Sequence, residues 1–416
     1  MKIHRLAATV AVLGVLALGQ TLQTASTSAR AAVEPITATQ LIVRIDPAVT
    51  TIASVNVAAG TTLAATSVSG RASYLVNVPA GVVPDTAAAA IAAHPGVDFV
   101  APNTTLTPPE VDQSRIYAWR IYAWAIGTAV PVESQYAPTA VDLSAAHATS
   151  NGAGVTVAVI DTGVQYAHPA LAGTLLPGWD FVGNDPDASE TLNGLDDDGD
   201  GLIDEGAGHG THVAGIVHQV APAAKILPVR ALDDDGSGTM WNVTEAMYWA
   251  AQHGATIENL SLGTHGSAKP LRVAVTELAT QNVLVVAAAG NDGLDRAMYP
   301  AATPDAIAVG SVGVGDKVST FSNFGNWIDV VAPGENIHST YAFPSNSYAM
   351  NSGTSMATPW VAGEAALIAS HRPGSTVASI TAAIRAGATS IDHINPTFAG
   401  KLGAGRIDIA ASLRAA

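Results

Sequence analysis

The segment VTVAVI, residues Val155–Ile160, is a run rich in β-branched apolar residues that ends directly before Asp161. Short runs of this kind are typical of strands buried on both faces of a parallel sheet. Helical patterns lie between several such runs, at Asn242–His253 and Pro270–Asn282. This alternation predicts an α/β domain over residues 144–416 with a mostly parallel central sheet. Four later runs share the strand character: KILPVR (Lys225–Arg230), ATIENL (Ala255–Leu260), VLVVAAA (Val283–Ala289) and AIAVGSV (Ala306–Val312).

Asp161, His209 and Ser355 each stand beside glycines in a distinctive motif. A serine is a weak nucleophile unless a base lies within hydrogen-bond reach, and the base in turn needs an orienting partner. Asp161 follows a predicted strand, and reactive groups collect at the carboxyl ends of parallel strands. The three side chains are therefore expected to form a catalytic triad. Their motifs are VAVIDTGV (Val157–Val164), GHGTHVAG (Gly208–Gly215) and SGTSMATP (Ser352–Pro359).

Ser355 precedes an apolar helical stretch, Met356–Ser370, so it is predicted to lie exposed at a helix N-terminus with its backbone N–H directed at whatever binds there. Pro359 is expected in the first turn, where its missing N–H costs nothing. An ordinary helix-capping serine is the alternative interpretation, since serine is common at that position.

His209 is predicted to open a helix and to act as the general base, with Gly208 and Gly210 allowing backbone and substrate to approach closely. His212 is the rival, because H-x-x-H suggests a metal pair. Metallopeptidase helices space their histidines four apart with an adjacent glutamate, and this chain has neither feature. His212 is therefore expected to be structural.

Asp161 begins the motif DTG, which also occurs in aspartic proteases. Those enzymes need two aspartates that share one proton, and Asp161 starts the only D-T/S-G motif in this chain. We therefore expect Asp161 to orient the histidine and to stabilise its protonated form.

The motifs, in the order Asp, His, Ser, together with AAAGND (Ala287–Asp292), resemble those of the subtilisin-like serine proteases. The resemblance implies a three-layer fold, an oxyanion hole that uses Asn291 and the Ser355 backbone N–H, and hydrolysis of peptide bonds by a serine endopeptidase. It further implies two backbone edges that flank an extended substrate, with Met298 on the pocket floor, which suits a medium or large apolar side chain. The residues of these edges are Ser261, Leu262 and Gly263 on one side and Ala288, Ala289 and Gly290 on the other.

Two positions depart from the pattern of that family. Glu258 stands in a predicted central strand where the family usually has an apolar residue, and a buried carboxylate is costly unless it is paired. We expect this glutamate to affect local packing more than catalysis. Trp360 replaces a frequent histidine without an expected consequence.

The acidic loop DDDGDGLIDE, residues Asp196–Glu205, suggests a structural Ca²⁺ site. Its aspartates have the one-three-five-nine spacing of a calcium loop, with Gly201 at the tight turn. The glutamate at position twelve is missing, since Ala207 occupies that slot, so the loop is not a full EF-hand. A solvated acidic loop is the alternative, but so many like charges repel one another without a cation. The expected ligands are Asp196, Asp198, Asp200 and Asp204.

Four regions are expected along the chain. Residues 1–31 are predicted to be a signal peptide, because the apolar run Leu6–Leu18 is too short for a membrane anchor and is followed by Ala29-Arg30-Ala31. Residues 32–107 have the pattern of a small α+β module with strands at Thr39–Ile45 and Ser73–Val78, a helix at Thr86–Ala93 and a further strand within Pro95–Asn103. This module resembles the family's propeptide, which assists folding and then inhibits; a permanent accessory domain is the alternative. Residues 108–143 form a junction with a processing site and the near-repeat RIYAW, and residues 144–416 form the catalytic domain.

Composition limits the partners and the compartment. The net charge of −16 argues against nucleic acid or an anionic membrane as a partner. The absence of cysteine excludes disulfides, a thiol nucleophile and Cys-ligated zinc. Together with the predicted signal peptide, the resemblance implies a secreted, monomeric hydrolase made as a zymogen, which acts on proteins or peptides and is inhibited by its own propeptide. No anchor follows Ala416, which favours free secretion. The alternatives are an acyl-transferring peptide ligase or cyclase with the same site, and an inactive binding homologue.

Overall fold

Seven strands form the central sheet of the larger domain, in the order β13-β12-β11-β10-β6-β8-β7, and each neighbouring pair is parallel. The computed structural model describes residues 39–109, 135–266 and 268–416. The strands are β6 (Thr156–Asp161), β7 (Trp179–Asp180), β8 (Lys225–Arg230), β10 (Ile257–Leu260), β11 (Leu284–Ala288), β12 (Ala306–Val312) and β13 (Val330–Pro333).

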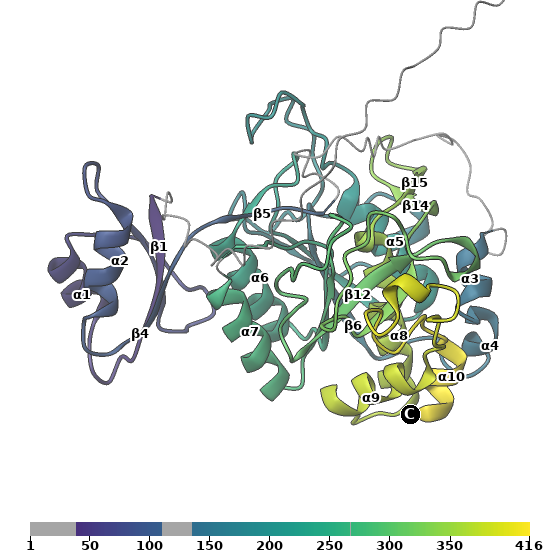
Figure 1. Ribbon diagram of the computed structural model, residues 1–416. Coiled ribbons are helices and arrows are strands. Elements are labelled where there is room, and N and C mark those ends of the chain that lie inside the picture. The colour runs from purple at the N-terminus through teal and green to yellow at the C-terminus, as the bar shows by residue number, and fades with distance from the viewer. Residues whose placement is uncertain (1–38, 110–134, 267) are drawn as a thin grey trace, which may run out of the picture. The chain divides into compact units, whose positions relative to one another are not determined.

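Helices cover both faces of this sheet, as Figure 1 shows for α6 and α7 on one side and α8 on the other. Successive strand residues point to opposite faces, so Val157 and Val159 pack in one core while Ala158 and Ile160 pack in the other. The α/β prediction is confirmed, with three layers. The helices of this domain are α3 (Tyr136–Ala140), α4 (Leu143–His147), α5 (His209–Val220), α6 (Met240–Gln252), α7 (Lys269–Thr280), α8 (Thr354–His371), α9 (Val377–Gly387) and α10 (Ile409–Ala415).

The five predicted strands of this sheet are all present, and those at Lys225–Arg230 and Ala306–Val312 have the predicted bounds. Short β7, the strand β13 and the antiparallel hairpin of β14 (Ile337–Tyr341) and β15 (Ser347–Asn351) were not predicted. Helices α3 and α4 also lie partly before residue 144, the predicted start of the catalytic domain. Ala137 of α3 and Val141, which follows it, are buried in the core with α5 and α8.

The N-terminal module has its own four-stranded antiparallel sheet in the order β2-β3-β1-β4. An α+β module was predicted, but α1 and β2 were missed. Four of the five β2 residues are exposed, so β2 carries no hydrophobic alternation from which to infer a strand. The elements are β1 (Gln40–Ile45), α1 (Ile52–Ala59), β2 (Thr62–Thr66), β3 (Ser73–Asn77), α2 (Pro84–Ala92) and β4 (Val97–Pro102).

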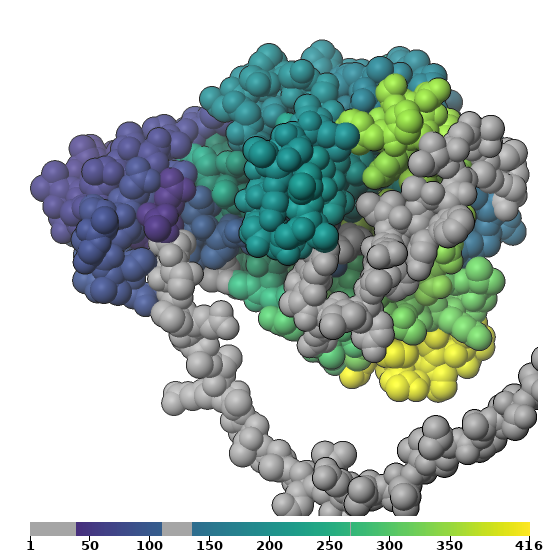
Figure 2. Space-filling view, turned by 90° about the horizontal axis from the view of Figure 1, so that it is seen from above, coloured from purple at the N-terminus to yellow at the C-terminus, as the bar shows by residue number. Residues whose placement is uncertain are grey.

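A short strand, β5 (Thr105–Leu106), follows the module and pairs antiparallel with β9 (Gly238–Thr239) of the larger domain. Figure 2 shows the two parts in contact. Arg44 of the module pairs with Glu277 of α7 at 2.6 Å, and the Ser67 hydroxyl donates to Glu245 of α6 at 2.8 Å. The predicted signal peptide and the near-repeat RIYAW lie outside the described residues. In the described part of the chain, no helix combines the length and apolarity that crossing a membrane requires.

Glu258, the unusual residue of the central strand β10, is fully buried. Its neighbour Leu260, which points to the same face, packs in the core beneath α6 and α7, so the carboxylate faces away from α5 and α8. Neither carboxylate oxygen has a hydrogen-bond partner in the described structure. Burial therefore raises the pKa of Glu258 well above its usual value, and the side chain is kept neutral.

We expect Glu258→Gln to stabilise the protein increasingly as the pH rises from 5 to 8. A carboxyl with a raised folded-state pKa favours folding fully only below its unfolded pKa, and this advantage is lost as the pH rises toward the folded value. The variant lacks that loss, so its gain grows by up to about 1.4 kcal/mol per pH unit. Urea unfolding at several pH values, in a Ser355→Ala background to prevent self-digestion, measures it. Parallel stability curves for the two proteins would contradict the assignment.

Candidate active site

The three predicted triad residues stand at strand ends and helix starts on one side of the sheet. Asp161 is the last residue of β6, His209 is the first of α5 and Ser355 is the second of α8. Asp161 follows the alternation of Val157 and Val159, so its side chain points to the face that α5 and α8 cover. The three motifs are distant in sequence, and the topology brings them to this face.

The Asp161–His209 contact joins the first two of these residues. Nδ1 of His209 donates to Oδ1 of Asp161 at 2.7 Å, and Asp161 is fully buried. The same oxygen accepts the backbone N–H of Thr162 at 2.8 Å, which fixes the carboxylate. The imidazole is thereby held in the tautomer and orientation that leave Nε2 to act as a base.

Glycines on either side of His209 permit close packing around it. Gly208 has φ 93°, a left-handed conformation that favours glycine, and a Cβ there would lie 2.3 Å from the Tyr341 ring. A Cβ at Gly210 would lie 2.1 Å from the backbone oxygen of Gly163. The expected close approach is therefore made by Tyr341 and by the turn after β6.

His212, the rival histidine, serves the fold. Its Nε2 donates to the backbone oxygens of Ile337 at 3.0 Å and Ala349 at 3.2 Å, which belong to opposite strands of the β14–β15 hairpin. Burial lowers the pKa of His212 to about 3, so the ring is neutral. The structural role predicted for His212 agrees with these contacts.

Ser355 is fully buried, whereas an exposed serine was expected. Its hydroxyl donates to the backbone oxygen of Ser261 at 3.1 Å, and the Ser261 hydroxyl donates back to the backbone oxygen of Ser355 at 2.9 Å. Two reciprocal bonds thus join the start of α8 to the segment after β10, and they place Ser355 in a packed seam.

Pro359 explains one of these bonds. It lies in the second turn of α8, not in the first turn as expected. A residue with an N–H at this position would donate to the carbonyl four residues earlier, which belongs to Ser355, but proline has no N–H. The Ser261 hydroxyl supplies the missing donor from outside the helix.

Asn291 lies just beyond β11, and its side chain is oriented by Thr354. Its Oδ1 accepts the backbone N–H of Thr354 at 3.0 Å and the Thr354 hydroxyl at 2.9 Å. Both donors approach the amide oxygen, so the orientation of the amide is set by the residue next to Ser355. The Thr354 hydroxyl in turn accepts the backbone N–H of Gly290 at 3.1 Å, which ties the predicted substrate edge of Ala288, Ala289 and Gly290 to α8.

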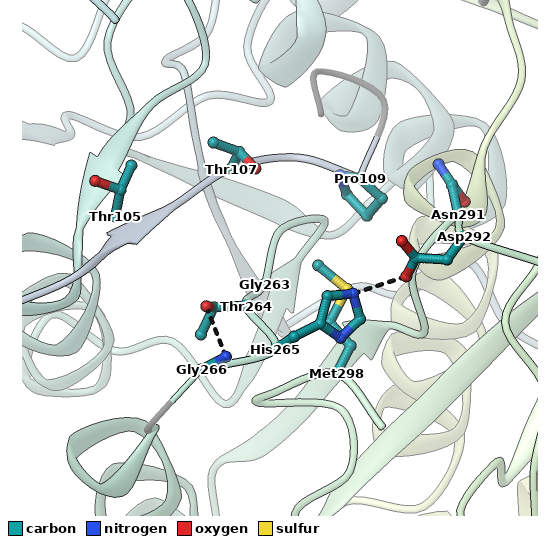
Figure 3. Close-up of a pocket in the computed structure, with 10 residues that line it drawn as sticks. All are labelled: Thr105, Thr107, Pro109, Gly263, Thr264, His265, Gly266, Asn291, Asp292 and Met298. Atoms are coloured by element: carbon teal, nitrogen blue, oxygen red, sulfur yellow. Dashed lines mark hydrogen bonds and ion pairs between the residues drawn. The ribbon is translucent and has the colours of Figure 1, made fainter. Parts of the chain in front are cut away.

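A cavity of about 260 Å³ opens beside Asn291 (Figure 3). Of the predicted pocket residues, Gly263 and Met298 line it. A Cβ at Gly263 would lie 2.8 Å from Met298, and one at Gly290 would lie 2.7 Å from it, so the Met298 side chain packs between the two backbone edges. The side chains of the remaining predicted residues are fully buried and do not line the cavity: Ser261, Leu262, Ala288 and Ala289.

The pocket also holds an ion pair that the sequence interpretation missed. Nε2 of His265 lies 2.7 Å from Oδ2 of Asp292 (Figure 3). Nδ1 of His265 donates to the backbone oxygen of Ala297 at 3.0 Å. The Asp292 carboxylate raises the pKa of His265, and the bond from His265 lowers the pKa of Asp292 to about 2. The only sequence signal was the position of Asp292 next to Asn291.

The segment that follows the N-terminal module runs along the same pocket. Thr107 and Gly263 exchange two backbone hydrogen bonds, of 3.0 and 3.4 Å. Leu106 is buried, and Thr105, Thr107 and Pro109 line the cavity. Chain from before the predicted catalytic domain therefore pairs with Gly263, on one of the two edges at which a substrate was predicted to pair.

The acidic loop, teal in Figure 1, contributes carboxylates to two groups of three. In each group, one oxygen from every carboxylate lies within 4.8 Å of the others. One group is Asp196, Asp198 and Asp235, and the other is Asp198, Asp200 and Glu205. Asp204, a predicted ligand, belongs to neither group, and its carboxylate accepts the backbone N–H groups of Asn193 and Gly194. Asp235 and Glu205 were not predicted.

The comparisons with known proteins agree on the family to which this chain is similar. Residues 152–405 match the model of the Subtilase family. The chain is 45% identical over 233 residues to the thermophilic serine proteinase of Bacillus sp. (strain AK1), covering 54% of each chain, and 44% identical over 260 residues to thermitase of Thermoactinomyces vulgaris, covering 60% of this chain and 86% of thermitase. It thus spans about half the length of the first relative. Fervidolysin from Fervidobacterium pennivorans shares the fold, with a TM-score of 0.73 at 22% identity over 92% of this chain and 61% of that one.

We expect Ser261→Ala to lower the free energy of unfolding by about 1–2 kcal/mol, because the buried carbonyl of Ser355 loses the donor that Pro359 cannot replace. Urea unfolding in the Ser355→Ala background measures this loss. Ser370→Ala is the matched control, since its hydroxyl donates to the backbone oxygen of Ala153 at an exposed position. An equal effect of the two substitutions would show that the carbonyl does not depend on Ser261.

Proposed function

Since the chain belongs to the subtilase family of serine endopeptidases, we propose that it is a secreted endopeptidase that uses Ser355, His209 and Asp161 to hydrolyse peptide bonds. The observation that carries the proposal is the buried 2.7 Å bond between Asp161 and His209, on the face of the sheet where α8 begins with Thr354 and Ser355. The segment 1–31, predicted from its sequence to be a signal peptide, supports secretion.

The chemistry follows from these positions. Oγ of Ser355 attacks the substrate carbonyl while Nε2 of His209 accepts its proton, and Asp161 stabilises the imidazolium that forms. His209 then gives the proton to the leaving amine, and an acyl-enzyme results. Water, deprotonated by His209, attacks the acyl carbon and regenerates the Ser355 hydroxyl. The side-chain amide of Asn291 and the backbone N–H of Ser355 are the proposed donors to the oxyanion at each tetrahedral stage.

We propose that Gly263 receives substrate by strand-to-strand pairing and that Met298 limits the pocket depth. Backbone pairing gives affinity with little demand on sequence, so selectivity rests on the cavity. Met298 offers an apolar surface, and the His265–Asp292 pair offers a polar wall next to Asn291. Proteins or peptides with medium or large apolar side chains at this position are the proposed substrates.

The N-terminal module is proposed to inhibit the enzyme until the junction is cut. The pairing of Thr107 with Gly263 supports this, because a substrate would use the same backbone groups of Gly263, and the pairing of Leu106 with Gly238 holds the segment in place. The ion pair of Arg44 with Glu277 and the bond of Ser67 with Glu245 hold the module to α6 and α7. Because Pro109 already lines the pocket, we propose that the first cut lies close after it, within the junction of residues 108–143.

A structural Ca²⁺ is the proposed cofactor of the acidic loop. Hard cations prefer oxygen ligands, and both groups of carboxylates consist of them. Neither carboxylate oxygen of Glu205 has a hydrogen-bond partner in the described structure, and burial, together with Asp235, Asp200 and Asp198, raises the pKa of Glu205 to about 7. A cation would relieve this repulsion. Asp198 belongs to both groups and is therefore the proposed central ligand.

We expect the wild-type chain, expressed without residues 1–31 and with Ca²⁺ present, to shorten by cleavage within the junction and to digest casein. Ser355→Ala should stay full length and inert, because the nucleophile is lost. Mass spectrometry of the precursor and a casein assay measure both effects, and the new N-terminus locates the cut. If both proteins shorten equally, a protease of the host cuts the junction, and the casein assay alone then tests whether Ser355 is the nucleophile. Two inert, full-length proteins would count against self-processing.

Removal of Ca²⁺ with a chelator is expected to lower the melting temperature by about 5–10 °C, because a ligand that binds only the folded state stabilises it by mass action. Scanning calorimetry of the Ser355→Ala protein, with and without Ca²⁺, measures the effect. Asp198→Asn should abolish this dependence. Asp204→Asn is the control within the same loop and should keep most of it, whereas a loss as large as that of Asp198→Asn would restore the ligand set expected from sequence spacing.

A further inference from the structure

Glu190 is a buried carboxylate beside the Asp161–His209 pair that has no part in the chemistry described above. It is 4% exposed and lies in the connection between β7 and α5. An acid in such a place is costly unless hydrogen bonds compensate for its burial. The arrangement around Glu190 supplies those bonds.

Four donors converge on the Glu190 carboxylate. Oε1 accepts the backbone N–H groups of Gly208 and Gly210, each at 3.1 Å, and also the hydroxyl of Thr162. Oε2 accepts the hydroxyl of Thr211. Three of the donors therefore belong to the start of α5, on both sides of His209 in sequence, and the fourth follows Asp161.

The start of a helix is its positive end, because the first backbone N–H groups have no partner within the helix. His209 stands there and must become an imidazolium during catalysis, which a positive end opposes. A carboxylate that accepts two of those N–H groups offsets this effect. Glu190 thus compensates for the cost of placing the general base at a helix N-terminus.

Glu190 is also joined to Asp161 through a shared hydroxyl. Oγ1 of Thr162 lies within hydrogen-bond distance of both carboxylates, 3.3 Å from Oδ1 of Asp161, and accepts the N–H of Gly210 at 3.0 Å. The titratable and charged groups that face Glu190 are Asp161 at the end of β6, His209 of α5 and Tyr341 of β14. Burial raises the pKa of Glu190 to about 7; Asp161 adds to this rise, whereas the two hydroxyls and His209 oppose it.

We propose that Glu190 is a positioning residue of the active site: its carboxylate holds the start of α5 against the turn after β6 and electrostatically supports the protonation of His209. The inference rests on the proposed function, since it assigns Glu190 a role through the general base. The ionised form has this effect, so the contribution of Glu190 grows as the pH rises through neutrality.

The test compares wild type with Glu190→Gln on a peptide-amide substrate from pH 5 to pH 10. Active sites are counted with phenylmethylsulfonyl fluoride, so that only correctly folded enzyme enters kcat. We expect kcat to fall about tenfold above pH 8 with KM unchanged, and the acid limb of kcat/KM to move to lower pH, because the imidazolium loses a neighbouring negative charge. Glu364→Gln is the matched control, since Glu364 is also fully buried, with burial raising its pKa to about 8, but lies in α8 beyond the site. It should leave kcat and the acid limb as in wild type.

A second variant, Thr211→Val, keeps Glu190 but removes one donor to its ionised form. The pKa of Glu190 should then rise, so kcat falls at pH 7 and recovers toward wild type at pH 9–10, which Glu190→Gln cannot do. This variant decides the matter if Glu190→Gln does not accumulate. The role of Glu190 would be overturned if kcat and the acid limb are unchanged in the variants that accumulate, or if Glu364→Gln causes the same loss. The proposed function would still stand in either case. A wild type that neither reacts with the inhibitor nor cleaves the substrate would overturn the proposed function and this inference with it.

Discussion

The parallel arrangement of the central strands is the constraint on which the rest of the site depends. Parallel strands end at one edge of a sheet, and the helices that return the chain start at that same edge. Asp161 ends β6, Ser261 follows β10 and Asn291 follows β11, while His209 and Ser355 stand at the starts of α5 and α8. Strand ends and helix starts thus meet where the chain's reactive groups lie, although the motifs are far apart in sequence.

Many polar groups are buried in this site, and their burial is costly unless hydrogen-bond partners lie nearby. The polar groups around His209 and Ser355 are bonded in pairs that cross between elements, such as Asp161 with His209, Thr354 with Asn291 and the reciprocal pair of Ser261 and Ser355. Glu258 shows the opposite case on the far face of the same sheet, where a carboxylate without partners stays neutral. Hydrogen-bond donors are aimed at the carboxylates of Asp161 and Glu190, and none in the described structure reaches Glu258.

The larger domain could be predicted from sequence to a considerable extent, because buried parallel strands such as Lys225–Arg230 and Ala306–Val312 are apolar throughout. The three candidate triad residues could also be picked out from the sequence, since each stands in a glycine-rich motif, and the structure brings Asp161 and His209 into contact. The exposed strand β2 and the β14–β15 hairpin carry no such pattern and were missed. In the acidic loop, spacing along the chain singled out Asp204, whereas the fold brings Asp235 from beyond β8 into one of the two carboxylate groups. The role of Glu190 could not be inferred from the sequence, because the donors to its carboxylate belong to two other segments of the chain.

Pro359 has a consequence for how the active site keeps its shape. By leaving the Ser355 carbonyl without its usual partner inside α8, it transfers a hydrogen bond from within a helix to the boundary between two elements. The segment that contains Ser261 and the start of α8 therefore cannot separate without leaving a buried carbonyl without its donor. In the proposed function these are the substrate edge and the nucleophile, and a backbone oxygen and one small hydroxyl join them. Side chains elsewhere on the pocket can then be exchanged to suit other substrates while the reacting atoms keep their alignment.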